Sequence, residues 1–231
     1  MKKTKAASGS ADRSVKVWNL ESQTSLSTYR IHLDTVSCVS WSRTINDIFL
    51  SCSQDGTCIL WDIRNPKPAS YVIKNDHMTS APTCASWQPE TQYTAAIGME
   101  TGQIVIKDAR NLKETVAEKN AHNRAINRIA FSKKYSHWLA SVSDDSTVAL
   151  TDVAQTAKTI YRSRVHKDFV HGLSWSPTDN TLLTCGWDGL VHQHSFMPET
   201  LSSDGLQSPV AMETAGAVTI YPNNIQNQFA V

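Results

Sequence analysis

The segment Ser51–Asp62, SCSQDGTCILWD, decides the fold that the sequence predicts. It contains two short runs of β-forming residues, which are joined by Asp55-Gly56, and it ends in Trp61-Asp62. Asp and Gly tolerate the positive φ that a tight hairpin turn requires, so the segment is predicted to form a β-hairpin. A single hairpin defines no fold, and its repetition along the chain therefore matters more.

The hairpin pattern returns with a regular period. A turn residue is followed six positions later by a strand-end residue at Asp12/Trp18, Asp55/Trp61, Thr101/Lys107, Asp145/Thr151 and Asp188/His194. A second marker keeps the same period, at His32, His77, His122 and His166. A repeat of about 40 to 45 residues with an early His and a late Trp-Asp is typical of WD repeats, each of which forms a four-stranded blade.

These repeats predict an all-β fold, a β-propeller of WD40 repeats with about four and a half blades, resembling the C-terminal part of a seven-bladed propeller. In the WD pattern, a buried hydrogen-bond relay joins the His, a strand Ser or Thr, the turn Asp and the Trp. The second repeat has the full set, His32, Ser51 or Ser53, Asp55 and Trp61. The relay positions of the other repeats are His122, Asp145, His166, Asp188, Asp12 and Trp18.

The period also predicts the boundaries along the chain. We expect a flexible basic terminus at 1–6, a repeat arc at 7–198, and a mostly disordered tail at 199–231, in which AVTIY (Ala217–Tyr221) is the candidate for an outer strand. The predicted blades are a partial blade at 7–30 and complete blades at about 31–74, 75–118, 119–163 and 164–198. Such an arc leaves two blade faces uncovered, so we expect a truncated propeller with low stability by itself.

The composition excludes some classes of function. The chain has 231 residues, 40% of them hydrophobic, and a formal charge of +1. This balance predicts a globular protein without an electrostatic footprint for nucleic acid, and no apolar run is long enough to predict a membrane span. No signal peptide follows Met1, so cytoplasmic and nuclear localisation is expected. The five scattered cysteines are expected to be reduced thiols in the core.

Zinc and catalysis are the two chemistries that the His and Asp residues suggest. His166, His171, His192, His194 and Cys185 lie close enough in the sequence to suggest zinc. However, His166 is the periodic His, and His192 and His194 alternate on one strand where the WD pattern ends. The relay also accounts for each Ser, His and Asp that a catalytic triad would need. We therefore expect no metal, no cofactor and no catalytic site.

The blade rim is the predicted surface for partners. It is built from the loop before the first strand of each repeat and from the inner hairpin turn. The candidates are Phe169, Trp187, Asp168, Asp34, Gln54 and Asp144. Exposed aromatic residues are typical binding hot spots, and the carboxylates suit arginine-rich peptides. The alternatives are that the aromatic rings stack on each other or on a neighbouring blade, and that the acids form turns.

Three stretches resemble a particular family. These are LSCSQDGTCILWDIRNPKPAS (Leu50–Ser70), VHKDFVHGLSWSP (Val165–Pro177) and LLTCGWDGLVHQH (Leu182–His194). They are similar to the corresponding blades of the methylosome protein 50 family, the WD-repeat partners of the type II protein arginine methyltransferase. The resemblance extends over roughly residues 7–197.

The resemblance implies a non-catalytic adaptor in a hetero-oligomer with that methyltransferase. Such an adaptor helps present arginine-rich protein substrates, such as histones and Sm proteins. The first two or so blades of that family, where much of the methyltransferase-facing surface is expected, have no counterpart here. The alternative is a generic WD40 peptide-recognition module, the substrate receptor of a ubiquitin-ligase or chromatin complex, which binds a short motif on the rim of Phe169 and Trp187.

Overall fold

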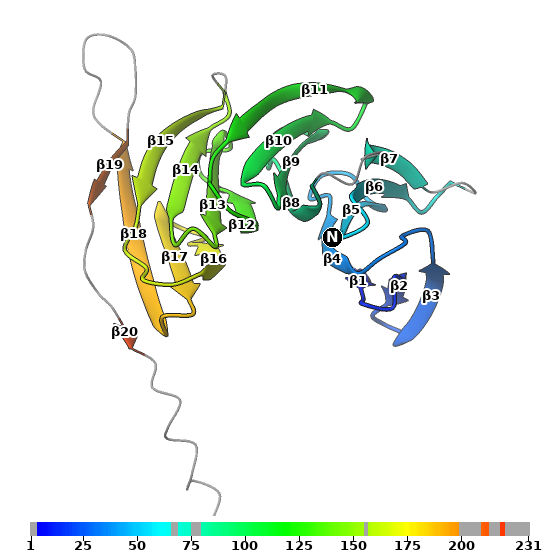
Figure 1. The fold of residues 1–231 in the computed structure, drawn as a ribbon. Helices are drawn as coiled ribbons and strands as arrows, with labels where there is room; N and C mark the ends of the chain where they lie inside the picture. Colours follow the sequence, from blue (N-terminus) through cyan, green and yellow to red (C-terminus); the bar gives the residue numbers. More distant parts are fainter. Residues whose placement is uncertain are drawn as a thin grey trace, which may run out of the picture.

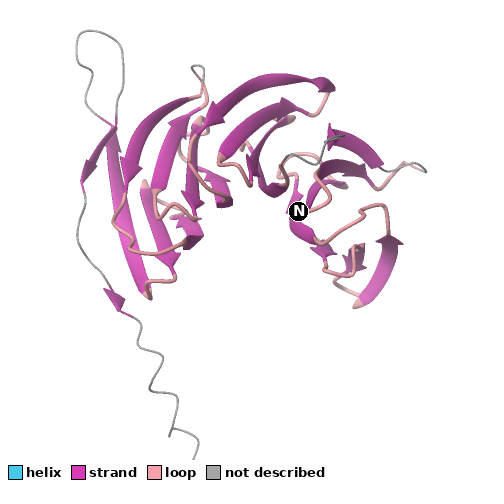
Figure 2. Ribbon diagram, in the orientation of Figure 1, coloured by secondary structure: helices cyan, strands magenta, loops and turns pink. Residues whose placement is uncertain are grey.

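The computed structural model describes residues 4–65, 69–74, 80–154, 157–198, 209–212 and 218–219. Across these ranges the chain forms strands, turns and loops (Figure 2). The same ranges contain no helix that could cross a membrane. The strands form five antiparallel sheets, which lie one after another along an arc (Figure 1). The all-β blade architecture that the sequence predicts is confirmed.

Each sheet is one blade, and its strands pair in chain order. The first blade has three strands, β1 (Lys5–Gly9), β2 (Val15–Asn19) and β3 (Thr24–Tyr29). The second has β4 (Val36–Trp41), β5 (Ile48–Ser53), β6 (Thr57–Asp62) and β7 (Ala69–Lys74). The third has β8 (Pro82–Trp87), β9 (Thr94–Met99), β10 (Gln103–Asp108) and β11 (Asn111–Asn120).

The last two blades continue this order. The fourth has β12 (Ile126–Phe131), β13 (Trp138–Ser143), β14 (Val148–Asp152) and β15 (Lys158–Ser163). The fifth has β16 (Val170–Trp175), β17 (Thr181–Gly186) and β18 (Leu190–Pro198), with β19 (Pro209–Met212) and β20 (Val218–Thr219) both paired to β18.

The inner hairpin turns explain the first sequence marker. In every blade the residue after the turn Asp or Thr has a positive φ, and these residues are Arg13, Gly56, Gly102, Ser146 and Gly189. Glycine adopts this left-handed conformation without steric cost, which explains its use in three of the five turns. The periodic turn residues therefore mark the joint between the second and third strands of each complete blade.

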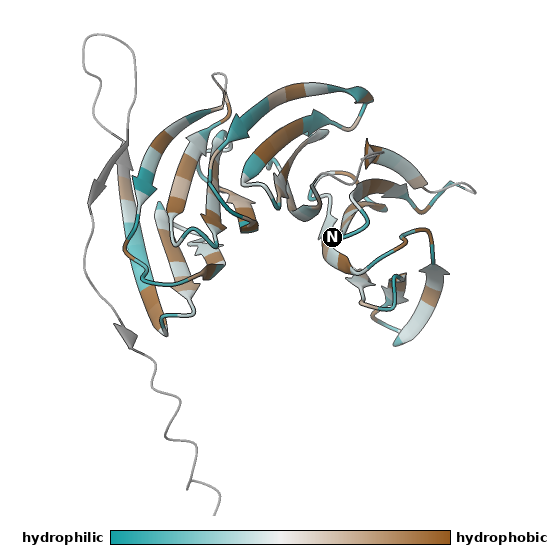
Figure 3. Cartoon of the chain, viewed as in Figure 1, coloured by the Kyte–Doolittle hydropathy of each residue, from teal (hydrophilic) through white to brown (hydrophobic). Residues whose placement is uncertain are grey.

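The apolar core lies between neighbouring blades. Val15 and Ile59 pack together between the first two blades, and Ala140 packs with Val170 between the last two. The middle strands are almost wholly buried, as in β13, whereas the outer strands β3 and β11 are largely exposed. The hydropathy colouring shows the same contrast between β10 and β3 (Figure 3). Each blade thus depends on its neighbour to bury its face.

Hydrogen bonds also join the blades. In the second, third and fourth blades, the second residue of the first strand donates to the carbonyl oxygen at the start of the next blade. Ser37 Oγ donates to Pro82 O at 3.3 Å, Thr83 Oγ1 donates to Ile126 O, and Asn127 Nδ2 donates to Val170 O at 2.9 Å. This periodic ladder fixes the stagger of successive blades.

The two ends of the chain differ from the prediction. Strand β1 begins at Lys5, inside the expected flexible terminus, and Lys5 Nζ lies 2.6 Å from Asp47 Oδ1 of the second blade. In the tail, β19 was not predicted, and β20 lies within the AVTIY segment. Both strands pair with the long strand β18, and local sequence indicated β20 but not β19. The rest of the tail, His77 and Pro66-Lys-Pro68 lie outside the described residues.

The expectation of five core thiols is wrong at Cys185. Cys52, Cys58 and Cys84 are buried and Cys38 is half-buried, but Cys185 is exposed. Cys185 lies on the face of β17 that no described blade covers. Leu183 on the same face is 44% exposed, whereas its counterpart Leu50 is 1% exposed beneath the third blade.

Candidate functional site

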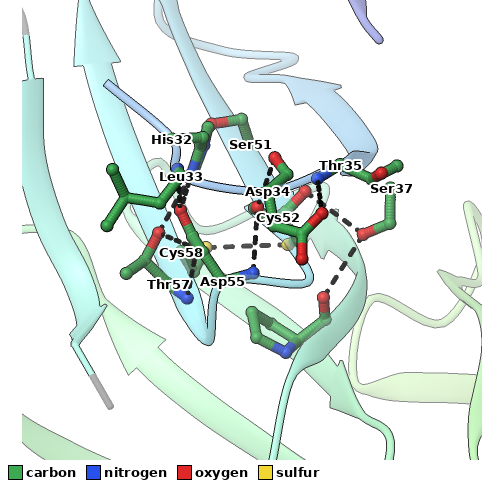
Figure 4. A network of polar contacts seen from close by, with 12 residues as sticks. His32, Leu33, Asp34, Thr35, Ser37, Ser51, Cys52, Asp55, Thr57 and Cys58 are labelled. Carbon is green, nitrogen blue, oxygen red and sulfur yellow. Dashed lines mark hydrogen bonds and ion pairs between the residues drawn. The ribbon is translucent and has the colours of Figure 1, made fainter. Parts of the chain in front are cut away.

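The relay of the second blade is complete. His32 Nδ1 lies 3.1 Å from Asp55 Oδ2 and 3.0 Å from Thr57 Oγ1, and His32 Nε2 lies 2.6 Å from Ser51 Oγ. Trp61 Nε1 donates to Ser51 Oγ at 2.8 Å. Asp55 also accepts the backbone N–H of Leu33 at 2.8 Å, which ties the loop before β4 to the hairpin turn (Figure 4).

The indole of Trp61 sets the direction of this relay. An indole N–H can only donate, so Ser51 accepts from Trp61, and donation of its own proton to His32 Nε2 gives every group of the relay a partner. His32 is then protonated at Nδ1, which donates to Asp55. Burial lowers the pKa of His32 despite the nearby carboxylate. Burial raises the pKa of Asp55 by itself, but hydrogen bonds from Thr57 and Leu33 outweigh it and hold that pKa below its usual range.

The fourth blade keeps the His–Asp part of the relay. His122 Nδ1 lies 3.2 Å from both carboxylate oxygens of Asp145, and His122 Nε2 lies 2.8 Å from Ser141 Oγ. Thr151 takes the place of the Trp, and its buried Oγ1 has no hydrogen-bond partner among the described residues. Here the relay ends at the serine.

The fifth blade closes its relay with a second histidine. His166 Nδ1 lies 2.9 Å from Asp188 Oδ2, and His166 Nε2 lies 2.9 Å from Thr184 Oγ1. Thr184 Oγ1 in turn lies 3.0 Å from Nε2 of His194, which occupies the place of Trp61, and His194 Nδ1 lies 3.1 Å from the hydroxyl of Tyr161. An imidazole nitrogen can donate or accept, so this relay has no fixed direction.

The first and third blades depart further from the pattern. In the first, Ser14 donates two hydrogen bonds to Asp12, which lowers the pKa of Asp12 to about 2, and Trp18 Nε1 donates to Ser8 Oγ at 2.9 Å. In the third, the buried Lys107 replaces the Trp, and its Nζ donates to the carbonyls of Leu112 at 3.4 Å and Glu114 at 3.2 Å.

In the second, fourth and fifth blades the relays join loops to hairpins and bury the Ser or Thr hydroxyl. Ser51 and Ser141 are both 0% exposed, so neither hydroxyl can reach a substrate. The blade rim is therefore the candidate functional surface. In three blades, the backbone N–H before the turn Asp donates to the carbonyl before the first strand: Gln54 to Thr35 at 2.9 Å, Asp144 to Ala125 at 3.1 Å and Trp187 to Phe169 at 2.9 Å.

The aromatic residues of the fifth blade gather at this rim. Trp187 is 67% exposed, and its ring centroid lies 5.4 Å from that of Phe169 and 5.2 Å from that of His171, with His171 nearly parallel to it. Asp144 of the fourth blade reaches the same place, with Oδ1 3.9 Å from His171 Nε2. We call Phe169, His171, Trp187 and Asp144 the fifth-blade rim. The sequence suggests His171 only as a zinc ligand, although it occupies the position in its strand that Asn127 has in the fourth blade.

The remaining rim candidates either lie in another blade or accept hydrogen bonds from the backbone. Asp168 is exposed beside the fifth-blade rim, and its Oδ1 accepts the N–H of Phe169 at 2.8 Å. Asp34 makes the same short-range contact to Thr35 at 2.6 Å. Asp34 and Gln54 are exposed but belong to the second blade, so the structure does not bring them into the aromatic cluster.

Comparison with known families agrees with this geometry. The family described as "WD domain, G-beta repeat" matches residues 3–19, 23–62, 113–152 and 157–195. These segments make up more than half of the chain, which therefore belongs to the WD-repeat family. The unmatched segment contains most of the third blade, where Thr101 and Lys107 replace the turn Asp and the Trp.

Individual relatives narrow the likeness further. The chain is 39% identical over 199 residues to methylosome protein WDR77 of Xenopus laevis. The aligned segment covers 85% of this chain and 58% of that protein. This likeness confirms the resemblance seen in the sequence. Protein transport protein Sec31A of Gallus gallus is 24% identical over 87% of the chain and 17% of its own length. Gem-associated protein 5 of Mus musculus is 26% identical over 64% of the chain and 10% of its own length.

Proposed function

We propose that this chain is a non-catalytic scaffold subunit of a protein arginine methyltransferase complex, in which it helps to present arginine-rich protein substrates. The observation that carries the proposal is the 39% identity to methylosome protein WDR77 across 85% of the chain. The buried relays support a structural role for the residues that could otherwise suggest catalysis. We further propose that the scaffold acts in the cytoplasm and the nucleus.

The fifth-blade rim is the proposed contact for arginine side chains. A guanidinium stacks on aromatic faces and pairs with carboxylates, and this rim supplies both within one cluster. Trp187 offers an exposed indole, and the carboxylate of Asp144 approaches the same stack through His171. The exposed Asp168 adds a second negative charge beside Phe169.

The first test is a pull-down of the full chain with the type II arginine methyltransferase, followed by a histone methylation assay. Full-length methylosome protein WDR77 of Xenopus laevis serves as the positive control. Co-purification and increased histone methylation would support the proposal. Failure of this chain under conditions in which the positive control binds would refute it for this chain.

The rim is tested with the substitution Trp187→Ala. Loss of a rim hot spot should weaken binding of a histone-tail peptide by about 10-fold or more. Leu33→Ala is the control, because Leu33 is 78% exposed on a loop of the second blade. Equal affinities of the two variants would show that the fifth-blade rim does not bind the substrate.

The exposed aromatic pair Phe169 and Trp187 also favours a second candidate, a peptide-recognition module that serves another complex. That function predicts tight binding of a short peptide by this chain in the absence of any methyltransferase. Peptide affinity measured with and without the methyltransferase distinguishes the two functions.

A further inference from the structure

The fifth blade contains a third potential metal ligand, a second imidazole, beside its His–Asp pair. One ligand atom from each of His166, Asp188 and His192 lies within 4.8 Å of the others. The imidazole rings of His166 and His192 meet edge to face, with centroids 4.5 Å apart. His192 Nε2 is buried and has no hydrogen-bond partner among the described residues. A buried imidazole nitrogen without a partner costs free energy, so this position calls for an explanation.

The extra histidine is specific to this blade. The residue two positions before the strand-end residue is Lys16, Ile59, Val105, Ala149 and His192 in the five blades. Ile59 and Ala149 are both fully buried and contribute only packing. The fold therefore accepts an aliphatic residue at this position, and the WD pattern does not require His192.

The three side chains match the ligands that zinc prefers. Zn²⁺ takes imidazole nitrogen and carboxylate oxygen at about 2.0 to 2.2 Å, which places neighbouring ligands about 3.3 Å apart. His166 Nδ1 and Asp188 Oδ2 are already 2.9 Å apart, so a small separation would accommodate an ion. The carboxylate offsets one of the two charges of the ion.

Coordination through His166 Nδ1 requires that the proton on this ring lie on Nε2. In the second blade the donor-only Trp61 disfavours that arrangement, because Ser51 would then accept from both Trp61 and His32 and its own buried proton would have neither of them as an acceptor. In the fifth blade His194 permits it. His166 Nε2–H can donate to Thr184, and Thr184 can donate to His194 Nε2, whose Nδ1–H can donate to the Tyr161 hydroxyl oxygen. Both rings stay neutral, and Thr184 then orients the ligand as outer-shell partners do in metal sites.

We propose that His166, Asp188 and His192 form a site for a zinc-like divalent transition-metal ion, with His194 and Thr184 positioning the His166 ligand. Water completes the coordination. The ion fastens the loop before β16 to the inner hairpin and to β18 of the fifth blade. The site is independent of the proposed scaffold function, because none of its ligands belongs to the fifth-blade rim.

The test is a titration of the full chain with Co²⁺ and then with Zn²⁺. The visible spectrum of bound Co²⁺ reports tetrahedral coordination, and equilibrium dialysis reports stoichiometry. We expect one ion per chain, with Zn²⁺ displacing Co²⁺. His192→Ile copies the second blade and should weaken affinity by about 10-fold or more, while His171→Val should leave it unchanged. Absence of binding to the unmodified chain, or unchanged affinity in His192→Ile, would overturn the site.

A second variant tests the positioning role of His194. His194→Trp keeps all three ligands but restores the donor-only indole of the second blade. We expect Co²⁺ affinity to fall by about 10-fold or more, while the thermal midpoint of the metal-free chain is maintained or rises. Unchanged affinity in a folded variant would show that the direction of the relay does not govern metal binding.

Discussion

One position in each blade decides how the buried relay is closed. In the second blade this position holds Trp61, whose indole fills the site and donates to Ser51. Thr151 in the fourth blade makes no such bond, so the relay there is shorter. Lys107 in the third blade donates to backbone carbonyls instead. The number of side chains hydrogen-bonded to the relay hydroxyl therefore differs between blades that have the same arrangement of strands.

This difference predicts unequal costs for the same substitution. Ser51→Ala leaves both Trp61 Nε1 and His32 Nε2 without a partner, whereas Ser141→Ala leaves only His122 Nε2. Because an unpaired buried polar group costs about 1–3 kcal/mol, we expect losses of about 2–4 and about 1–2 kcal/mol in the free energy of unfolding. Urea denaturation measures both. Equal losses would show that the indole hydrogen bond contributes nothing net.

The relay histidines also predict how stability depends on pH. Burial lowers the pKa of His32 and His166 below the ordinary 6.5, so the unfolded chain takes up protons below pH 6.5 while the folded chain does not. Stability should fall as the pH drops through this window, by up to about 1.4 kcal/mol per pH unit for each histidine.

Aspartates extend this dependence to lower pH. The relay hydrogen bonds hold the pKa of Asp55 and Asp188 below 3.8 despite their burial, so their stabilisation is lost as the pH falls below 3.8. Thermal midpoints measured from neutral pH downward test both windows. A midpoint that rises as the pH drops below 6.5 would mean that the folded state prefers charged histidines.

Among the elements, the first strands of the blades provide a second set of contacts. They end in Trp41, Trp87, Phe131 and Trp175. The indoles of Trp87 and Trp175 donate across the blade boundary, to Ser40 O at 3.0 Å and Ala130 O at 2.9 Å. Trp41 Nε1 is buried without a partner among the described residues, because the first blade has no described strand at that place.

The same substitution should therefore differ between blades. Trp175→Phe removes the donor to Ala130 O and should lower the free energy of unfolding by about 1 kcal/mol beyond the packing change. Trp41→Phe removes a buried donor that has no partner among the described residues. Loss of this N–H should leave the free energy of unfolding unchanged or raise it, apart from the packing change. Chemical denaturation of both variants gives the comparison. A larger loss for Trp41→Phe would contradict the assignment of the hydrogen bonds.

For the molecule as a whole, the open face of the fifth blade is the main consequence of the arc. Leu183 and Cys185 lie where Leu50 and Cys52 of the second blade are covered by a neighbour. The fifth blade therefore lacks part of the apolar burial that stabilises each interior blade.

The reactivity of the thiols measures whether this face is exposed to solvent. We expect one fast-reacting thiol in the native chain, Cys185, and slow reaction of the others. Burial raises the pKa of Cys38 to about 12, which disfavours its reactive thiolate. Alkylation followed by peptide mass analysis identifies the labelled site, and Cys185→Ser should abolish the fast phase. Fast labelling of Cys52 or Cys84 would mean that the blades separate readily.

The sequence by itself indicated about four and a half blades, the position of most strands and the His–Asp pairs of the second, fourth and fifth blades. These features follow from local rules, since turn residues need a positive φ and buried strands need apolar residues at a fixed period. The Asp55-Gly56 turn and its counterparts therefore suffice to place the hairpins. Likewise, the pairing of His32 with Asp55 follows from the repeat.

Only the tertiary structure decided which faces are covered and which distant side chains meet. Exposure of Cys185, pairing of β19 with β18, stacking of His171 on Trp187 and contact of His192 with His166 all depend on how separate segments pack. Periodicity assigns a residue to a strand position, but burial depends on whether another element lies against that position. The residues of the candidate rim and of the proposed metal site were therefore visible in the sequence only as scattered residues.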